Sequence, residues 1–125
     1  MAHGHIHWSE CVTDDVDAAK AVFGKTAGWS FHAMSMGEFD YHVAMVGDKA
    51  VAGIMPRSAM PDPNIPPHWI TYVEVADADT AAKAVEESGG TVVRPAFDVP
   101  NVGRIVIVSE PGGTVAGLIQ PADQG

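Results

Sequence analysis

Apolar residues occur along the chain in short runs that end at polar residues or glycine. Two such runs, at residues 6–12 and 69–75, are rich in aromatic and β-branched side chains, which is typical of strands. Six more strand-like runs follow in two groups of three: WSFHAM, YHVAMV and AVAGIM, then TVVRP, RIVIVS and TVAGLI. The pattern therefore predicts eight strands in two sets of four.

An alanine-rich segment follows each first run, and its small side chains predict a helix packed closely on a sheet. An aspartate can cap the amino end of each helix, either Asp14 or Asp15 for the first and either Asp77 or Asp79 for the second. Glycine follows both segments and ends the helices. Each half of the chain is therefore predicted to be βαβββ, with the helix on one face of its sheet and the other face open.

The two halves also repeat one another in sequence. HWSECV and HWITYV open them, DAAKAV and TAAKAV follow, and VAGIM and VAGLI come last, at offsets of 61, 63 and 64 residues. We interpret residues 1–125 as a single domain in which module one covers 5–55 and module two covers 68–121. The proline-rich stretch between them, residues 56–67, predicts an extended linker.

Composition narrows the classes of protein to which the chain can belong. Its 125 residues, 46% of them hydrophobic, suffice for a domain with a core, and no apolar run is long enough to cross a membrane. A formal net charge of −9 argues against binding to nucleic acid or to an anionic membrane. The start of the chain does not resemble a signal peptide, and the single Cys11 excludes an intrachain disulfide, so we expect a cytoplasmic protein.

The motifs of both halves resemble the vicinal oxygen chelate superfamily, which includes glyoxalase I, extradiol dioxygenases and bleomycin-resistance proteins. The first half carries WSECVTDD, then AAKAVFG and GW, and it closes on VAGIMP. The second half is similar almost throughout, from HWITYVEVADAD to GGTVAGLIQP. The resemblance covers residues 8–121. It implies an α+β fold in which two tandem βαβββ modules form a cupped mixed sheet with the helices outside, the glyoxalase/bleomycin-resistance fold. Members of this glyoxalase-like subgroup often have no assigned reaction.

The metal-dependent members hold their ion with four side chains, usually a His on the first strand and a Glu on the last strand of each module. When these positions are transferred by resemblance, the last-strand ligands fall at Gly53 and Gly117. Glycine has no side-chain donor, whereas a divalent ion needs nitrogen or oxygen ligands to replace water. Both glutamates of the usual site are therefore missing.

The first-strand positions fall at or next to Trp8 in module one, and at Trp69 or Ile70 in module two. None of these side chains is a metal ligand. A shift of one residue would instead turn His7 and His68 inward and give a site of two histidines without carboxylates. We therefore expect no metal cofactor of the usual four-ligand kind, with a divalent metal at a non-standard site as the less favoured alternative.

The amino-terminal run HGHIH looks like metal-binding chemistry, but most of it lies outside the repeat. His3 and His5 precede the repeated segment, and we expect them at a frayed or edge-strand terminus. In that position they could bind metal during purification without any function.

The concave face of the cup is where a ligand is expected. If Trp8 points inward, Glu10 shares its face, and Trp69 and Thr71 are the matching residues of module two. Two indole rings supply stacking surface for a flat ligand, and the two last-strand glycines leave room for it. The alternative is that both tryptophans only fill the cores of their modules.

Two further residues are matched between the modules on the next-to-last strands. These are His42 and Arg104, with Tyr41 and Gly103 as the alternative inward positions. Arg104 would bind a carboxylate group of a ligand in the cup, and a buried Glu10 could act as acid or base together with His42. Alternatively, Glu10 only forms a structural ion pair with one of them.

Three functions remain open after these considerations. The favoured one is binding of a small anionic or aromatic organic molecule without the four-ligand metal site. The second is a lyase-like or dioxygenase-like enzyme that uses Glu10 and His42, or a non-standard metal site. The third is a standard metal-dependent enzyme, against which the missing glutamates argue. Superfamily members often form dimers, so a homodimer is the expected assembly, and whether the modules pair within one chain or across the dimer stays open.

Overall fold

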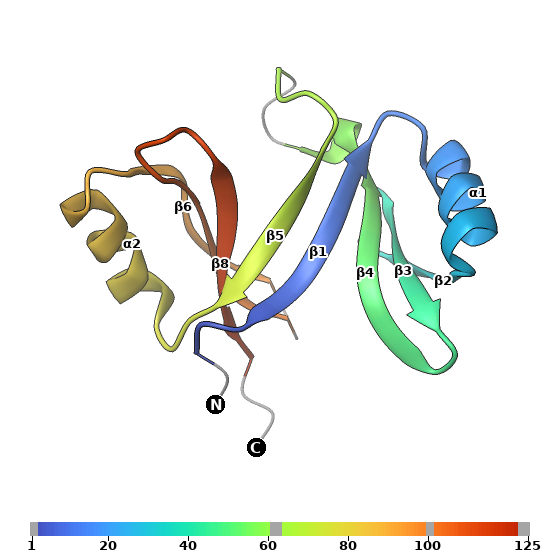
Figure 1. Cartoon of the computed structure of the whole chain (residues 1–125), viewed down its shortest axis with the longest axis horizontal. Helices are drawn as coiled ribbons and strands as arrows, with labels where there is room; N and C mark the ends of the chain where they lie inside the picture. The colour runs from blue at the N-terminus through green and yellow to red at the C-terminus, as the bar shows by residue number, and fades with distance from the viewer. Residues whose placement is uncertain (1–2, 61–63, 100–101, 123–125) are drawn as a thin grey trace. The chain divides into compact units, whose positions relative to one another are not determined.

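The computed structural model describes residues 3–60, 64–99 and 102–122. The chain divides into two compact units: the first unit is Trp8–Ile70, and the second unit combines Met1–His7 with Thr71–Gly125. In chain order the elements are β1 (Ile6–Thr13), α1 (Val16–Ala27), β2 (Ser30–Ser35), β3 (Asp40–Val46), β4 (Lys49–Pro56), the short 3-10 helix η1 (Arg57–Ala59), β5 (His68–Glu74), α2 (Ala78–Glu87), β6 (Thr91–Val99), β7 (Gly103–Ser109) and β8 (Val115–Pro121) (Figure 1). Within the described residues, neither α1 nor α2 has the length and apolar character that crossing a membrane would need.

Both units have the same strand topology. In the first unit, β1 pairs in parallel with β4, and β4, β3 and β2 follow as antiparallel neighbours. In the second unit, β5 pairs in parallel with β8, and β8, β7 and β6 follow in the same way. The expected α+β class and the repeated βαβββ pattern are therefore confirmed.

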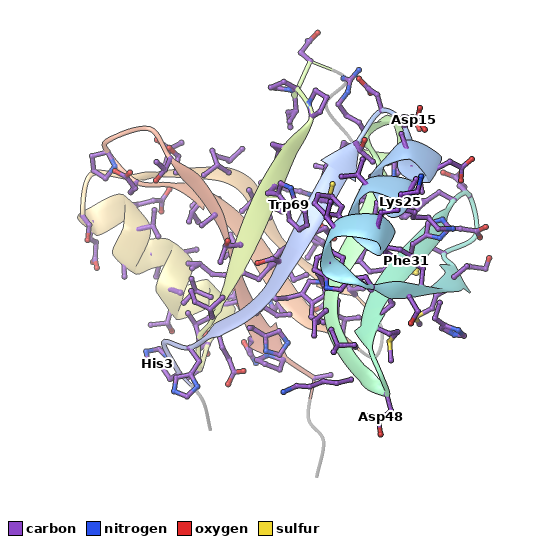
Figure 2. The ribbon with its side chains drawn as sticks, turned by 45° about the vertical axis from the view of Figure 1, so that its right-hand side comes forward. His3, Asp15, Lys25, Phe31, Asp48 and Trp69 are labelled. Atoms are coloured by element: carbon purple, nitrogen blue, oxygen red, sulfur yellow. The ribbon has the colours of Figure 1, made fainter. Side chains whose placement is uncertain are left out.

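Side chains and glycine define the ends of the helices as the sequence suggested. Of the alternative caps, the structure uses Asp15 for α1, whose carboxylate accepts a hydrogen bond from the Ala18 N–H at 3.0 Å. Figure 2 shows Asp15 at the start of this helix. Asp77 caps α2 in the same way. Helix α1 ends at Gly28, which adopts the left-handed conformation that glycine favours.

Helix α1 packs on the face of its sheet that carries Phe31. The Nζ atom of Lys20 lies 5.8 Å from the centre of the Phe31 ring, and a Cβ built at Gly24 would lie 3.9 Å from the same ring. Phe31 pairs with Ala44, so both point to this face. We call it the helix face of the first unit; it carries the buried core residues Cys11, Ala44, Ala52 and Ile54.

Helix α2 covers the corresponding face of the second unit. The backbone N–H of Ala78, the first residue of α2, donates to Oε1 of Gln120 on β8 at 2.9 Å. Asp79, one residue further along, accepts two hydrogen bonds from Arg104 on β7. Arg104 and Gln120 are partners in the sheet, so both belong to the helix face.

The segment between β4 and β5 is not extended throughout, because η1 forms a turn of helix at its start. Arg57 in η1 donates from Nε to the Asp14 carboxylate at 2.6 Å and from Nη1 to the carbonyl of Ile65 at 3.1 Å. The first bond holds the segment to the loop that precedes α1, and the second joins two parts of the segment itself. Residues 61–63 of the predicted linker lie outside the described residues.

Candidate functional site

The face of the first unit's sheet opposite α1 carries Gly53 on β4, and we call it the Gly53 face. Glu10 on β1 and Val43 on β3 are the neighbours of Gly53 on its two sides in the sheet. Trp8 precedes Glu10 by two residues and so points to the same face, because side chains alternate along a strand. The structure therefore brings Trp8, Glu10 and Gly53 to one face.

A hydrogen-bonded network of three side chains covers this face. The indole Nε1–H of Trp8 donates to the hydroxyl oxygen of Tyr41 at 2.8 Å. The Tyr41 hydroxyl in turn forms a side-chain hydrogen bond with Glu10. Glu10 is only 9% exposed, so this carboxylate is largely removed from water. Because an ionised carboxylate can only accept, the hydroxyl donates to it.

Tyr41 fills the space into which a side chain at position 53 would project. A Cβ built on Gly53 would overlap the hydroxyl and the outer ring atoms of Tyr41. The tyrosine therefore lies across the glycine, held there by its hydrogen bonds to Trp8 and Glu10. Sequence reasoning named Tyr41 only as an alternative to His42 and gave it no role.

The environment keeps the Tyr41 hydroxyl protonated. Burial raises the pKa of Tyr41 far above its ordinary value, and the negative charge of Glu10 raises it further. The hydrogen bond from Trp8 acts in the opposite direction but is outweighed. At neutral pH Tyr41 is therefore a hydrogen-bond donor to Glu10 and is unsuited to act as a base.

The second unit repeats the arrangement of ring over glycine. A Cβ built on Gly117 would overlap ring atoms of Tyr72, its partner on β5. Glu74, two residues after Tyr72, is buried on the same face and pairs with Nδ1 of His7 at 3.0 Å. Neither Tyr72 nor Glu74 was among the predicted site residues, although the alternation along β5 from the partner of Gly117 would have indicated both.

The strand partners of the two glycines show how the modules correspond. Glu10 is the β1 partner of Gly53, and Tyr72 is the β5 partner of Gly117. Glu10 and Tyr72 are therefore equivalent positions. The sequence match of HWSECV with HWITYV is one residue out of this register, and a slip of one residue reverses every side chain on a strand.

Because of this slip, the expected placement of Trp69 and Thr71 was wrong. The residue equivalent to Trp8 is Ile70, and Trp69 and Thr71 point to the opposite face of β5. Trp69, which Figure 2 labels on β5, lies on that opposite face. Its ring packs edge-on against Phe23 of α1, with ring centres 5.5 Å apart, and Trp69 is 45% exposed. These two residues do not share a face with Gly117.

The expectation that His42 shares a face with Glu10 was also wrong. His42 pairs with Ile54 on β4 and with Ala33 on β2, both on the helix face of the first unit. Within the described part of the chain, its Nδ1 atom is buried and makes no hydrogen bond. Tyr41, the alternative at this site, occupies the Gly53 face instead, so Glu10 and His42 do not form an acid–base pair.

Arg104 does not lie on the face of the second unit's sheet that carries Gly117. Its guanidinium group lies on the α2 side of the second unit, 3.1 Å from carboxylate oxygens of Asp79 and Asp98. The hydrogen bonds to Asp79 and Asp98 raise the pKa of Arg104 above its ordinary value. The expected role of Arg104 as a clamp for an anion beside Gly117 was therefore wrong, and the sheet register rather than the repeat decides its direction.

The amino-terminal histidines are held by the second unit rather than frayed. The backbone N–H of Glu74 donates to the carbonyl of His5 at 2.8 Å, and Nδ1 of His3 accepts from the Ala76 N–H at 2.9 Å. Together with the pair of His7 and Glu74, these bonds fix the start of the chain along the end of β5. The run HGHIH therefore has a structural explanation.

Comparison with known proteins decides the family. The sequence profile described as Glyoxalase/Bleomycin resistance protein/Dioxygenase superfamily matches residues 3–116. The chain belongs to this superfamily. It is 37% identical over 122 residues to CFP32 of Mycobacterium tuberculosis, which is named as a glyoxylase, covering 97% of this chain and 46% of that protein. It is 27% identical over 117 residues to the anthracycline biosynthesis protein DnrV of Streptomyces peucetius, covering 94% of this chain and 42% of that protein. The chain thus spans less than half the length of these curated relatives.

Solved structures agree with this assignment at the level of the fold. The chain is similar to methylmalonyl-CoA epimerase from Mycobacterium tuberculosis with a TM-score of 0.67 and 17% identity, covering 97% of this chain and 89% of that one. A hypothetical protein from Bacillus halodurans is similar with a TM-score of 0.72 and 7% identity, covering 98% and 97% of the two chains. At such low identities the likeness shows the superfamily fold alone.

The residues of this superfamily member do not fit a four-ligand metal centre. The four corresponding positions hold Trp8, Gly53, Ile70 and Gly117, and none of these has a metal-binding side chain. The rings of two tyrosines fill the volume into which glutamates at 53 and 117 would extend. Among residues 3–60, 64–99 and 102–122, no three His, Cys, Asp or Glu side chains gather closely enough to hold a metal ion.

Proposed function

We propose that the protein binds a small aromatic organic molecule on the Gly53 face and does so without a four-ligand metal centre. The observation that carries the proposal is the network of Trp8, Tyr41 and Glu10 across Gly53. It combines two aromatic rings with one largely buried carboxylate, and a few placed polar groups among aromatic side chains are typical of small-molecule sites.

The named relatives support an organic ligand but do not identify it. One relative is named as a glyoxylase and another for anthracycline biosynthesis, and an anthracycline is a flat aromatic compound. The anionic ligand considered from sequence depended on Arg104, which already pairs with two aspartates. A surface hollow of about 340 Å³ beside Arg104 is lined also by Asp98 and Gln120. We do not place the ligand there, because its one cationic group is already neutralised.

Protein prepared without an affinity tag is expected to contain less than stoichiometric nickel, zinc, iron and manganese. The reason is that Trp8, Gly53, Ile70 and Gly117 offer no ligands. Elemental analysis by mass spectrometry checks this, and a chelator is expected to leave the melting temperature unchanged. A stoichiometric metal that survives the paired replacements His3→Ala and His5→Ala would contradict the proposal, because those variants remove adventitious binding at the amino terminus.

An aromatic ligand is expected to raise the melting temperature of the wild-type protein and not that of Trp8→Phe. Binding to the folded state stabilises it by about 3 kcal/mol when the ligand exceeds its Kd a hundredfold. Removing the Trp8 indole also removes the hydrogen bond that holds Tyr41. Trp69→Phe is the matched control, since Trp69 lies on the helix side and should leave the ligand effect intact. Equal loss in both variants would speak against the Gly53 face.

A second candidate function is acid–base catalysis by Glu10. Its burial and its hydrogen bond to Tyr41 favour this role, since a desolvated and oriented carboxylate can exchange a proton with a bound substrate. His42 has no part in it, because it lies on the other face. This function requires a ligand that is turned over by the wild-type protein and only bound by Glu10→Gln. A cytoplasmic location and a homodimer remain proposals alongside both functions.

A further inference from the structure

We propose that two copies of this chain form a dimer through the outer edge of β2, with the two β2 strands paired antiparallel. Within the described residues β2 pairs with β3 alone, so the N–H and C=O groups along its second edge have no strand partner. Five of the six residues of β2 are exposed, so this edge is accessible to another strand. The inference gives a surface to the homodimer expected from sequence, and it does not depend on the ligand proposed for the Gly53 face.

The contrast between β2 and the other outer strand, β6, is the first step of the argument. In β6, Arg94 carries a charge and Pro95 lacks an N–H, and both are exposed. Register shifts on both sides of Arg94 also interrupt the pairing of β6 with β7. All these features discourage pairing with a further strand. The sequence of β2, SFHAMS, contains no Asp, Glu, Lys, Arg or Pro, and its six residues pair with β3 in unbroken register.

The second step is the distribution of charge, which favours a second copy of the chain as the partner. The formal net charge of −9 makes two copies repel each other, and β2 is a stretch without acidic residues at which they can meet. Lys25 lies in the last turn of α1 before β2, whereas Glu38 and Asp40 follow β2. Antiparallel pairing brings the start of one strand to the end of the other, so Lys25 of each copy lies toward Glu38 and Asp40 of the second copy.

The third step is the symmetry of such a pair. A twofold axis perpendicular to the sheet relates two antiparallel copies of one strand, and residues directly opposite each other point to the same face. Because neighbours along a strand point to opposite faces, one residue at the axis must lie opposite its own copy. If the pair is centred on the six residues of β2, this residue is His32 or Ala33. Each copy uses its open edge in the pair, so assembly stops at two chains and does not continue into a filament.

Sedimentation equilibrium and amide hydrogen exchange by NMR, both on the untagged wild-type chain, test the inference. We expect a species with twice the mass of the 13.1 kDa chain. Amides that bond to β3 alternate along β2 with amides that face outward, so in the dimer consecutive amides of β2 should exchange slowly. Ala33→Glu places like charges close together at the axis and should raise the dimer Kd by at least about tenfold. Val93→Glu is the matched control, because it adds the same charge at an exposed apolar residue of β6 and should leave the Kd unchanged.

Three results would overturn the inference. The first is a chain that stays monomeric at the concentrations used for NMR. The second is a dimer in which slow and fast amides alternate along β2, because the two copies would then meet at another surface. The third is an equal loss of affinity in Ala33→Glu and Val93→Glu, which would show an effect of net charge and not of β2. Mass and exchange are measured on the wild-type protein, so they decide the matter even where Ala33→Glu does not fold.

Discussion

Replacing Gly53 with alanine is expected to lower the free energy of unfolding by about 2–4 kcal/mol. The added Cβ would overlap the outer end of Tyr41, so the tyrosine must move. That movement breaks its hydrogen bonds with Trp8 and Glu10, the second of which is to a largely buried carboxylate. Chemical denaturation of the two proteins under the same conditions gives the difference.

Gly24→Ala is the matched control for this substitution. Gly24 lies inside α1, and a Cβ there would meet the Trp29 carbonyl at 3.6 Å and the Phe31 ring at 3.9 Å, which is ordinary contact. Alanine in a helix is more favourable than glycine by up to about 1 kcal/mol, so this variant should be as stable as the wild type or more stable. The two substitutions are therefore expected to change the free energy of unfolding differently, because the Cβ added at 53 overlaps Tyr41 and the Cβ added at 24 makes only ordinary contacts.

A double-mutant cycle isolates the role of Tyr41 in the effect at Gly53. In a Tyr41→Ala background the added Cβ has room, so Gly53→Ala should cost less than about 1 kcal/mol there. An equal cost of Gly53→Ala in both backgrounds would mean that the glycine is required for another reason. The tyrosine would then not be what keeps a larger side chain out of this position.

The elements of the fold could be predicted from the sequence because their signals are local. Asp15 and Asp77 cap the helices by bonding to backbone only three residues away, and Gly28 ends α1 through its own conformation. The same βαβββ order in both halves follows from the repeat. These features can be predicted without knowing which strands pair.

It was harder to predict on which face of the sheet each side chain lies, because this depends on pairing between distant segments. The match of HWSECV with HWITYV was the most conspicuous part of the repeat, yet it is out of register by one residue. That single step placed Trp69 and Thr71 on the wrong side. The face on which His42 lies was predicted wrongly for a related reason. Its neighbour Tyr41 was an equal candidate for the Gly53 face, and only the pairing of β3 with β4 shows which of the two lies there.

The two glycines on the last strand of each module were therefore the most informative residues of the sequence for the site. Gly53 and Gly117 were recognised as positions without metal ligands, but the room expected above them for a ligand is filled by the rings of Tyr41 and Tyr72. Tyr41 comes from β3 and Tyr72 from β5, so the two rings reach equivalent glycines from different strands. No repeat in the sequence could match them, because they are not equivalent residues.

Replacing Tyr41 with phenylalanine is the second change for which a large effect is expected, about 2–4 kcal/mol of unfolding free energy. The hydroxyl accepts from Trp8 and donates to Glu10, so its removal takes the acceptor from the Trp8 N–H and one hydrogen-bond donor from the Glu10 carboxylate. Because the ring stays in place over Gly53, the loss reports the hydrogen bonds rather than a cavity. Unfolding by urea at neutral pH measures it.

The Tyr41 hydroxyl also makes the free energy of unfolding depend on pH in the alkaline range. Burial and the charge of Glu10 raise the pKa of Tyr41 in the folded protein above its value of about 10 in the unfolded chain. The folded state thus holds this proton more tightly, so the contribution is full below about pH 10 and is lost as the pH rises above it. Tyr41→Phe should therefore lose less stability over that range than the wild type. Identical slopes for wild type and Tyr41→Phe, together with equal stability at neutral pH, would mean that the network does not hold the Gly53 face together.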